Sequence, residues 1–172
     1  HDAVFRNVVA PREALIETGD AKGAPNVWFA TLLAAVYLGA ALAARDAVIG
    51  YALERTPSAL GRPIATLPSI QRQIGEIDVI LSAARALLLE VAGEWLGAGD
   101  RAAFMARVAA AKVAVTTAAH EATAKALQVA GGAGITRALP LERYFRDVRP
   151  AAMQPPAGDT AYEMVGRAAL RL

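Results

Sequence analysis

The sequence predicts an all-α fold: an up-down four-helix bundle with short C-terminal helices, preceded by a single residual β-strand. Three long stretches have the apolar content or the residue spacing of helices, and clusters of Gly and Pro separate them. The chain has 172 residues, of which 55% are hydrophobic, so it can bury one core of ordinary size.

The expected strand lies near the start of the chain. Residues 3–9 have the pattern of a half-buried strand, and Pro11 stops it. A lone strand has no partner in an otherwise helical chain, so we expect that the sequence begins partway through a larger protein.

The first helix is expected to begin after Asn26, a good N-cap residue, and to end near Arg55. Its first part, residues 27–44, is an uncharged run about as long as a membrane span. The run continues without a break into Arg45-Asp46 and an amphipathic stretch. A helix that is apolar on all sides can equally be the centre of a soluble core, so we predict no membrane span.

The second helix is expected from Pro68 to about Leu96, where apolar residues recur at spacings of four and three, as in a bundle seam. The seam consists of Ile70, Ile74, Ile77, Leu81, Ala84, Leu88, Val91 and Trp95. The third helix is expected from about Arg101 to Val129, with Asp100 as its N-cap. Its small side chains would let a neighbour approach closely, along an inner face of Phe104, Val108, Val115, Ala119, Ala122 and Ala126.

Two short helices are expected after the third. One lies in the segment LPLERYFRDVR, and the other is the last helix, capped by Asp159 or Thr160. Pro155 and Pro156 separate the two.

Composition excludes several classes of function. The net charge is +2 and the arginines are scattered among acids, which argues against a nucleic-acid surface. The absence of cysteine excludes disulfides, thiolate zinc sites and cysteine nucleophiles. Neither His1 nor His120 follows a Glu by three residues, so we predict no metal site. His120 with Glu121 is interpreted as an ordinary polar pair of a helix rather than a catalytic one.

Three glycines follow the third helix in the stretch ALQVAGGAGI, residues 126–135. Such a cluster can stop a helix, turn the chain tightly, or let backbone N–H groups approach a phosphate. It is not a dinucleotide-binding fingerprint, because it lacks the preceding strand and the G-x-G-x-x-G spacing. The glycines alone leave these alternatives open.

Several segments together resemble the C-terminal half of acyl-CoA dehydrogenases. VFRNVVAPREAL is similar to the last β-domain strand of that family, and GYALERTPSALGRPIATLPSIQRQIGEI to its Y-x-x-x-R-x-x-F-G-x-P-I segment. LQVAGGAGITRALPLERYFRDVR is similar to the family's Q-x-x-G-G-x-G and P-x-E-R-x-x-R-D motifs, and this match is long and specific. The resemblance implies that residues 1–22 are the last strand of a truncated middle β domain with its linker. Residues 23–172 would then be the C-terminal helical bundle domain.

The resemblance also implies a function. Members of the family are FAD-dependent oxidoreductases that bind FAD between the subunits of a dimer or tetramer. This chain would therefore contribute to a homo-oligomer and to an FAD site across the interface, in a cytoplasmic parent protein that acts on acyl-CoA or a similar thioester. The cofactor-binding residues implied are Arg55, Leu60, Gln128, Val129, Gly131 and Gly132.

Arg55 matches the family arginine that reaches the FAD pyrophosphate, and its planar fork can hold two phosphate oxygens. Here the motif is two residues longer, with Leu60 in place of an aromatic residue, so we expect the loop to bulge. The pairs Glu142-Arg143 and Arg146-Asp147 are interpreted as structural, fixing the short helix against the bundle.

The catalytic base of the family is absent from its usual place. The dehydrogenases remove the substrate α-proton with a glutamate, and Pro155 stands at that position here. The start of the first helix, residues 27–30, also lacks an acid. The remaining candidates are Asp159 and Glu163. Flavin monooxygenases of the family need no such base but often carry a histidine after the R-D pair, where this chain has Met153 and Gln154.

Two alternatives to a dehydrogenase therefore stay open. One is a flavin-dependent monooxygenase on the same fold. The other is a non-catalytic helical assembly module that has kept the bundle and lost the flavin.

Overall fold

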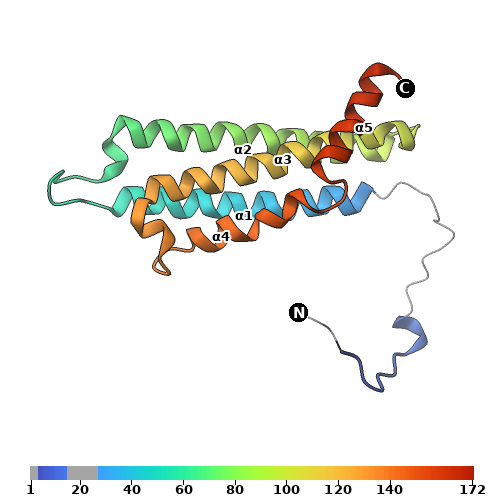
Figure 1. Cartoon of the computed structure of the whole chain (residues 1–172), viewed down its shortest axis with the longest axis horizontal. Coiled ribbons are helices and arrows are strands. Elements are labelled where there is room, and N and C mark those ends of the chain that lie inside the picture. The colour runs from blue at the N-terminus through green and yellow to red at the C-terminus, as the bar shows by residue number, and fades with distance from the viewer. Residues whose placement is uncertain (1–3, 15–26) are drawn as a thin grey trace.

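Three long antiparallel helices lie side by side in the computed structural model, which describes residues 4–14 and 27–172 (Figure 1). They are α1 (Val27–Glu54), α2 (Pro68–Glu94) and α3 (Arg101–Ala130). The shorter α4 (Leu141–Asp147) packs on α1 and α3, and α5 (Gly158–Leu170) packs on α3 near its start. The predicted helical bundle is confirmed.

Short 3-10 turns connect or extend the helices. They are η1 (Arg12–Ala14), η2 (Ile64–Thr66), η3 (Trp95–Gly97), η4 (Gly131–Ile135) and η5 (Arg149–Ala152). Together, η4 and α4 bring the chain back along the bundle from the end of α3 (Figure 1).

The predicted strand was wrong for the residues that the structure describes. Val4–Val9 form bends and irregular backbone, and the side chains of Val4, Phe5, Val8 and Val9 are exposed. A strand needs a paired partner for its backbone groups, and no other segment in the described part of the chain is extended beside this one. Residues 1–3 and 15–22 of the predicted strand-and-linker segment, and the cap residue Asn26, lie outside the described residues.

The most extensive contact between helices joins α1 and α3. Each helix presents a row of buried alanines, including Ala34, Ala41 and Ala44 on α1 and Ala119 and Ala122 on α3. Small side chains allow the two backbones to approach closely, so that the interior is filled largely by main chain and methyl groups. The inner face predicted for α3 is confirmed, although Phe104 is only half buried, against Trp95.

The α2 seam is confirmed over most of its length. It is buried from Ile77 to Trp95, whereas Ile70 and Ile74 near the start of α2 are half buried. Ion pairs then join α2 to its neighbours. Arg45 on α1 donates to both carboxylate oxygens of Asp78, at 2.6 and 3.1 Å, and Lys125 on α3 pairs with Glu76 at 2.7 Å.

Of the two helix caps predicted from the sequence for residues that the structure describes, the cap of α3 is confirmed and the cap of the last helix is wrong. Asp100 caps α3 by accepting hydrogen bonds from the backbone N–H groups of Ala102 and Ala103. The cap predicted for the last helix was wrong, because α5 begins at Gly158 and Ala157 holds the N-cap position without a side-chain hydrogen bond. Asp159 and Thr160 consequently lie inside the first turn, where an acidic side chain favours the helix dipole but does not cap it.

Two helical stretches are long and apolar enough to cross a membrane: α1 and residues 102–135. Within their most apolar windows, 44% and 50% of residues are buried inside the bundle. The core helix of a soluble protein has the same length and composition, so this feature is weak evidence for a membrane span.

The close α1–α3 contact leads to a prediction about stability. Ala41 is fully buried at this contact, so Ala41→Leu should force the helices apart and lower the free energy of unfolding by about 1–3 kcal/mol. Urea denaturation would measure it. The control is Ala86→Leu, at an exposed position of α2, which should change stability by less than about 0.5 kcal/mol. Equal effects of the two substitutions would contradict the packing described here.

Candidate cofactor site

The glycine turn ends α3 and reverses the chain. Gly131 has a φ of +57°, which L side chains rarely adopt, and its N–H donates to the carbonyls of Leu127 and Gln128. Gly134 is buried, and a Cβ there would lie 3.1 Å from that of Ala130. Gly132 is exposed with open space around it, so neither strain nor packing requires a glycine at this position. A closely approaching ligand would be a reason for it.

The other implied cofactor residues on α3 differ in exposure. Gln128 is exposed at the last turn of the helix, with its amide available to a ligand. Val129 is buried and packs in the main core, so only its main chain could contribute to a site.

Arg55 is the first residue after α1, in a loop that is folded on itself. The Ile64 N–H donates to the Arg55 carbonyl at 2.9 Å, and the Pro57 carbonyl accepts from Leu60 and Gly61. These bonds accommodate the two extra residues, so the bulge expected from the sequence has a defined geometry. The Arg55 side chain is exposed, and its guanidinium pairs with none of the residues that the structure describes.

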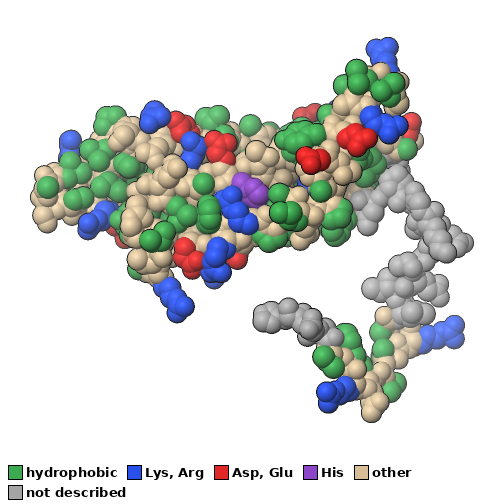
Figure 2. Space-filling view, viewed as in Figure 1, with side chains coloured by type: hydrophobic (Ala, Val, Ile, Leu, Met, Phe, Trp, Pro, Cys, Tyr) green, Lys and Arg blue, Asp and Glu red, His purple; other side chains and the backbone are tan. Residues whose placement is uncertain are grey.

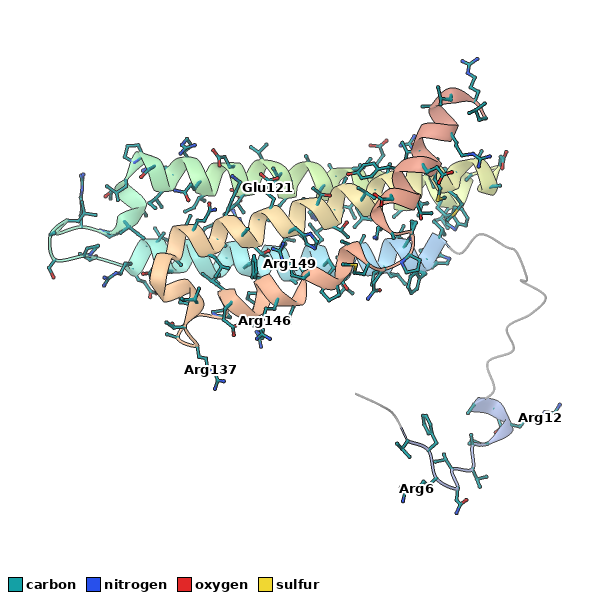
Figure 3. All side chains as sticks on the ribbon, viewed as in Figure 1. Arg6, Arg12, Glu121, Arg137, Arg146 and Arg149 are labelled. Atoms are coloured by element: carbon teal, nitrogen blue, oxygen red, sulfur yellow. The ribbon has the colours of Figure 1, made fainter. Side chains whose placement is uncertain are left out.

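The Arg55 loop and the glycine turn lie at the same end of the bundle (Figure 1). Residues 55 and 128 are therefore brought to one end although they are 73 positions apart in the sequence. Separate Lys and Arg side chains stand among apolar residues at this end, and Arg137 projects away from the bundle beside the turn (Figures 2 and 3). The arrangement offers an unpaired guanidinium and open backbone to an anionic ligand.

The position expected for the catalytic base lies elsewhere, in the connection between α4 and α5. Pro155 is exposed there, and both remaining candidates, Asp159 and Glu163, are exposed on α5. A general base that must be tuned by burial needs a less solvated environment than these two carboxylates have. In the described residues, neither candidate has the surroundings of a buried general base.

A row of polar residues on α3, which we call the polar stripe, consists of Lys112, Thr116, His120 and Thr123. Lys112, His120 and Thr123 contact this connection, whereas the Thr116 hydroxyl donates to the Val113 carbonyl within α3. The Lys112 ammonium donates to the carbonyls of Ala151, Gln154 and Pro156, each at 2.9 Å, and His120 Nε2 lies 2.7 Å from the carbonyl of Val148. A carbonyl only accepts, so Nε2 of His120 carries the proton in this contact.

Arg149, which belongs to the α4–α5 connection, makes further hydrogen bonds to α3. Its guanidinium donates to the carbonyl of His120 and to the Thr123 hydroxyl, and it stacks over the ring of Phe145 at 3.9 Å (Figure 3). Sequence reasoning missed this site. The signal was the spacing of Lys112, which lies four residues after Val108 and three before Val115 and so belongs to the inner face.

The charged pairs of α4 were expected to fix it against the bundle, and this prediction was wrong. Arg146 binds Glu142 within the helix, at 2.8 Å on an exposed face, and Arg143 lies over the Tyr144 ring. Such i,i+4 pairs stabilise the helix itself rather than its docking. Buried Leu141 and Val148 make the apolar contact with the core instead.

The described residues contain no group of three or more His, Cys, Asp or Glu side chains that could hold a metal ion.

Comparisons with known proteins define the family. A family model described as acyl-CoA dehydrogenase, C-terminal domain, matches residues 28–169. YdbM of Bacillus subtilis (strain 168), which is named among the acyl-CoA dehydrogenases, is 35% identical over 161 residues, covering 92% of this chain and 42% of that protein. A 3-sulfinopropanoyl-CoA desulfinase of Paraburkholderia xenovorans (strain LB400) is 38% identical over 116 residues, covering 67% of this chain and 28% of its own length.

Solved structures agree with the sequence relatives. The butyryl-CoA dehydrogenase of Megasphaera elsdenii superposes with a TM-score of 0.76 and 26% identity, covering 83% of this chain and 36% of that one. The chain therefore belongs to the acyl-CoA dehydrogenase family, as its C-terminal domain. It spans 42% or less of the lengths of the relatives named here.

The polar stripe makes stability depend on pH. Burial, more than the nearby charge of Arg149, lowers the pKa of His120 below its usual 6.5. The unfolded chain then binds more protons than the folded chain as the pH falls through 6.5, so the free energy of unfolding should decrease between pH 7.5 and 5.5. Thermal unfolding at the two pH values would measure the decrease, and it should be smaller in His120→Gln.

The ion-paired carboxylates do not account for a change in this range. The pKa values of Glu76, Asp78 and Glu142 are lowered by their cationic partners, so these carboxylates stay ionised down to pH 5.5. An equal pH dependence in His120→Gln and the unaltered protein would contradict the assignment to His120.

Proposed function

We propose that this chain is the C-terminal part of an FAD-dependent oxidoreductase that acts on acyl-CoA or a similar acyl thioester. Family membership supports the proposal, as do relatives whose names include a short-chain specific acyl-CoA dehydrogenase of Bos taurus, 35% identical over 117 residues, covering 68% of this chain and 27% of that protein. The observation that carries it is that the loop with the unpaired Arg55 and the turn with the open Gly132 backbone lie at the same end of the bundle.

The residues at this end fit the adenine and pyrophosphate of an FAD held mainly by a neighbouring subunit. Both α1 and α3 end here, whereas α2 begins here, so helix dipoles of both signs lie near the ligand. Arg55 adds a full positive charge for the pyrophosphate, with a fork that suits two phosphate oxygens. Gln128 offers an amide donor and acceptor, and Gly131 and Gly132 offer main chain. Leu60 and the main chain of Val129 would complete the contact.

We also propose that the bundle assembles with further copies of this chain. An open groove of about 530 Å³ between α2, α3 and α5 is lined by small and apolar residues, among them Ile80, Leu87, Val113, Ala114, Ala118 and Val165. A concave apolar surface of this kind can receive the apolar side chains of a partner. Sedimentation of the complete protein tests this proposal, and a monomer would contradict it.

The predicted domain boundary at residue 22 and the cytoplasmic location stay predictions. Several relatives carry the word mitochondrial in their names.

Dehydrogenation of an acyl thioester is the first candidate reaction. A flavin-dependent monooxygenase is the second, and the exposed Pro155 at the position of the base favours it. Bound FAD would supply electron or oxygen chemistry in either case. In both reactions this chain would contribute the guanidinium of Arg55, the main chain of Gly131 and Gly132, and the position of the α4–α5 connection.

Anaerobic flavin spectra of the complete protein distinguish these candidates. If the protein is a dehydrogenase, a panel of acyl-CoAs should bleach the flavin absorbance, and a carboxylate outside the described candidates must then act as the base. A flavin that stays oxidised with every acyl-CoA would favour oxygen chemistry instead. A protein without flavin would favour a non-catalytic assembly module and contradict the proposed cofactor role.

Arg55→Ala tests the cofactor site directly. Loss of the cation should weaken FAD binding at least about tenfold, because a charge-assisted contact contributes about 1.5–3 kcal/mol. Flavin released during dialysis, measured by fluorescence, would report the change. The matched control is Arg62→Ala, an exposed arginine of the same loop, which should retain flavin as the unaltered protein does. Equal flavin loss from both variants would contradict a specific role for Arg55.

A further inference from the structure

Lys112 is an unusual residue for the centre of a helical bundle. It lies in the middle of α3 with only 1% of its surface exposed, and none of the described acids forms an ion pair with it. A buried ammonium without a counter-ion is costly unless every donor is satisfied. Its three N–H groups meet three backbone carbonyls, so the charged form is fully hydrogen-bonded although burial lowers the pKa of Lys112.

The three carbonyls belong to a segment that cannot satisfy them itself. Residues 148–157 contain Pro150, Pro155 and Pro156, each of which lacks an N–H, and no regular helix spans the segment beyond the short η5. Carbonyls in such a segment need donors from elsewhere, and Lys112 supplies three of them. His120 supplies a fourth to Val148.

The outward side of the same segment is open. Met153 is 82% exposed, and Pro155 is exposed beside it, while the carbonyls of their neighbours point to α3. One face of residues 148–157 is therefore hydrogen-bonded to α3, and the opposite face, with Met153, is exposed. The start of α1 lies close to it, with Trp28, Leu32 and Val36 exposed along one side of that helix.

We propose that Lys112 is a positioning residue of the reaction: its ammonium fixes the backbone of residues 148–157, and so sets where Met153–Pro155 stand relative to the substrate. The proposal rests on the proposed function and on the resemblance that aligns Pro155 with the catalytic base of the family, which would bring these residues to the reacting end of an acyl thioester. Lys112 itself touches neither substrate nor cofactor. It acts through the main chain, so its contact does not depend on which side chains the connection carries.

Lys112→Met in the complete protein, purified with its cofactor, removes the three donors and keeps the apolar stem. Amide exchange of Ala151, Ala152, Met153 and Gln154 should become at least about tenfold faster, while exchange in α1 and α2 stays unchanged. Turnover of the acyl thioester should fall by about tenfold or more, since small displacements at a reacting centre have effects of that order. KM should change by less than about threefold and flavin content should be unaltered, which separates loss of position from loss of binding.

Two further variants complete the experiment. Lys112→Gln keeps two donors and should give intermediate values for exchange and turnover, and it serves in place of Lys112→Met if that variant does not fold. The matched control is Lys125→Met, another lysine of α3, which pairs with Glu76 away from the connection and should leave both readouts unchanged.

The outcomes are distinguishable. Unchanged exchange in the connection of both Lys112 variants would overturn the proposed contact, and faster exchange with unchanged turnover would overturn the positioning role. An unaltered protein that lacks flavin would overturn the proposed function and the positioning role with it, whereas the exchange data would still decide whether Lys112 holds the connection.

Discussion

The close approach of α1 and α3 is the constraint on which the rest of the structure depends. Alanines such as Ala41 and Ala119 face each other along these helices, so little space remains between the two backbones. A bundle packed in this way has no room in its centre for a cofactor or a cluster of large polar groups. Binding and chemistry are consequently confined to the ends of the helices and to the segments that connect them.

The polar stripe is the exception inside this apolar interior, and it too follows from the packing. The connection between α4 and α5 lies against α3 without a regular helix to satisfy its carbonyls. Lys112 and His120 provide the missing donors, and the Arg149 guanidinium in turn donates to the carbonyl of His120 on α3. Lys112 and His120 bind main-chain carbonyls rather than carboxylates, so their contacts fix a backbone path without specifying the side chains on its outer face.

The end of the bundle that receives the proposed FAD has the opposite character. It is exposed, it carries the unpaired Arg55, and its glycine turn leaves main chain uncovered at Gly132. Two helix C-termini and the N-terminus of α2 lie there, and the guanidinium of Arg55 adds a full positive charge for an anion. The α4–α5 connection lies away from this end, which is consistent with a flavin shared between subunits: one copy would hold the adenine side and another the reacting side.

The sequence by itself determined the helices, the α2 seam and the alanine face of α3, because these depend on residue spacing along one continuous segment. Its motifs also identified the family, since Gln128, the glycines and the R-D pair stand at fixed separations. The tertiary structure alone decided that residues 4–9 form no strand, that Val129 is buried and that the Arg146 pair stays within its own helix. It alone revealed the three carbonyls on Lys112, because these contacts join residues about forty positions apart and depend on how whole helices pack, which local spacing does not encode.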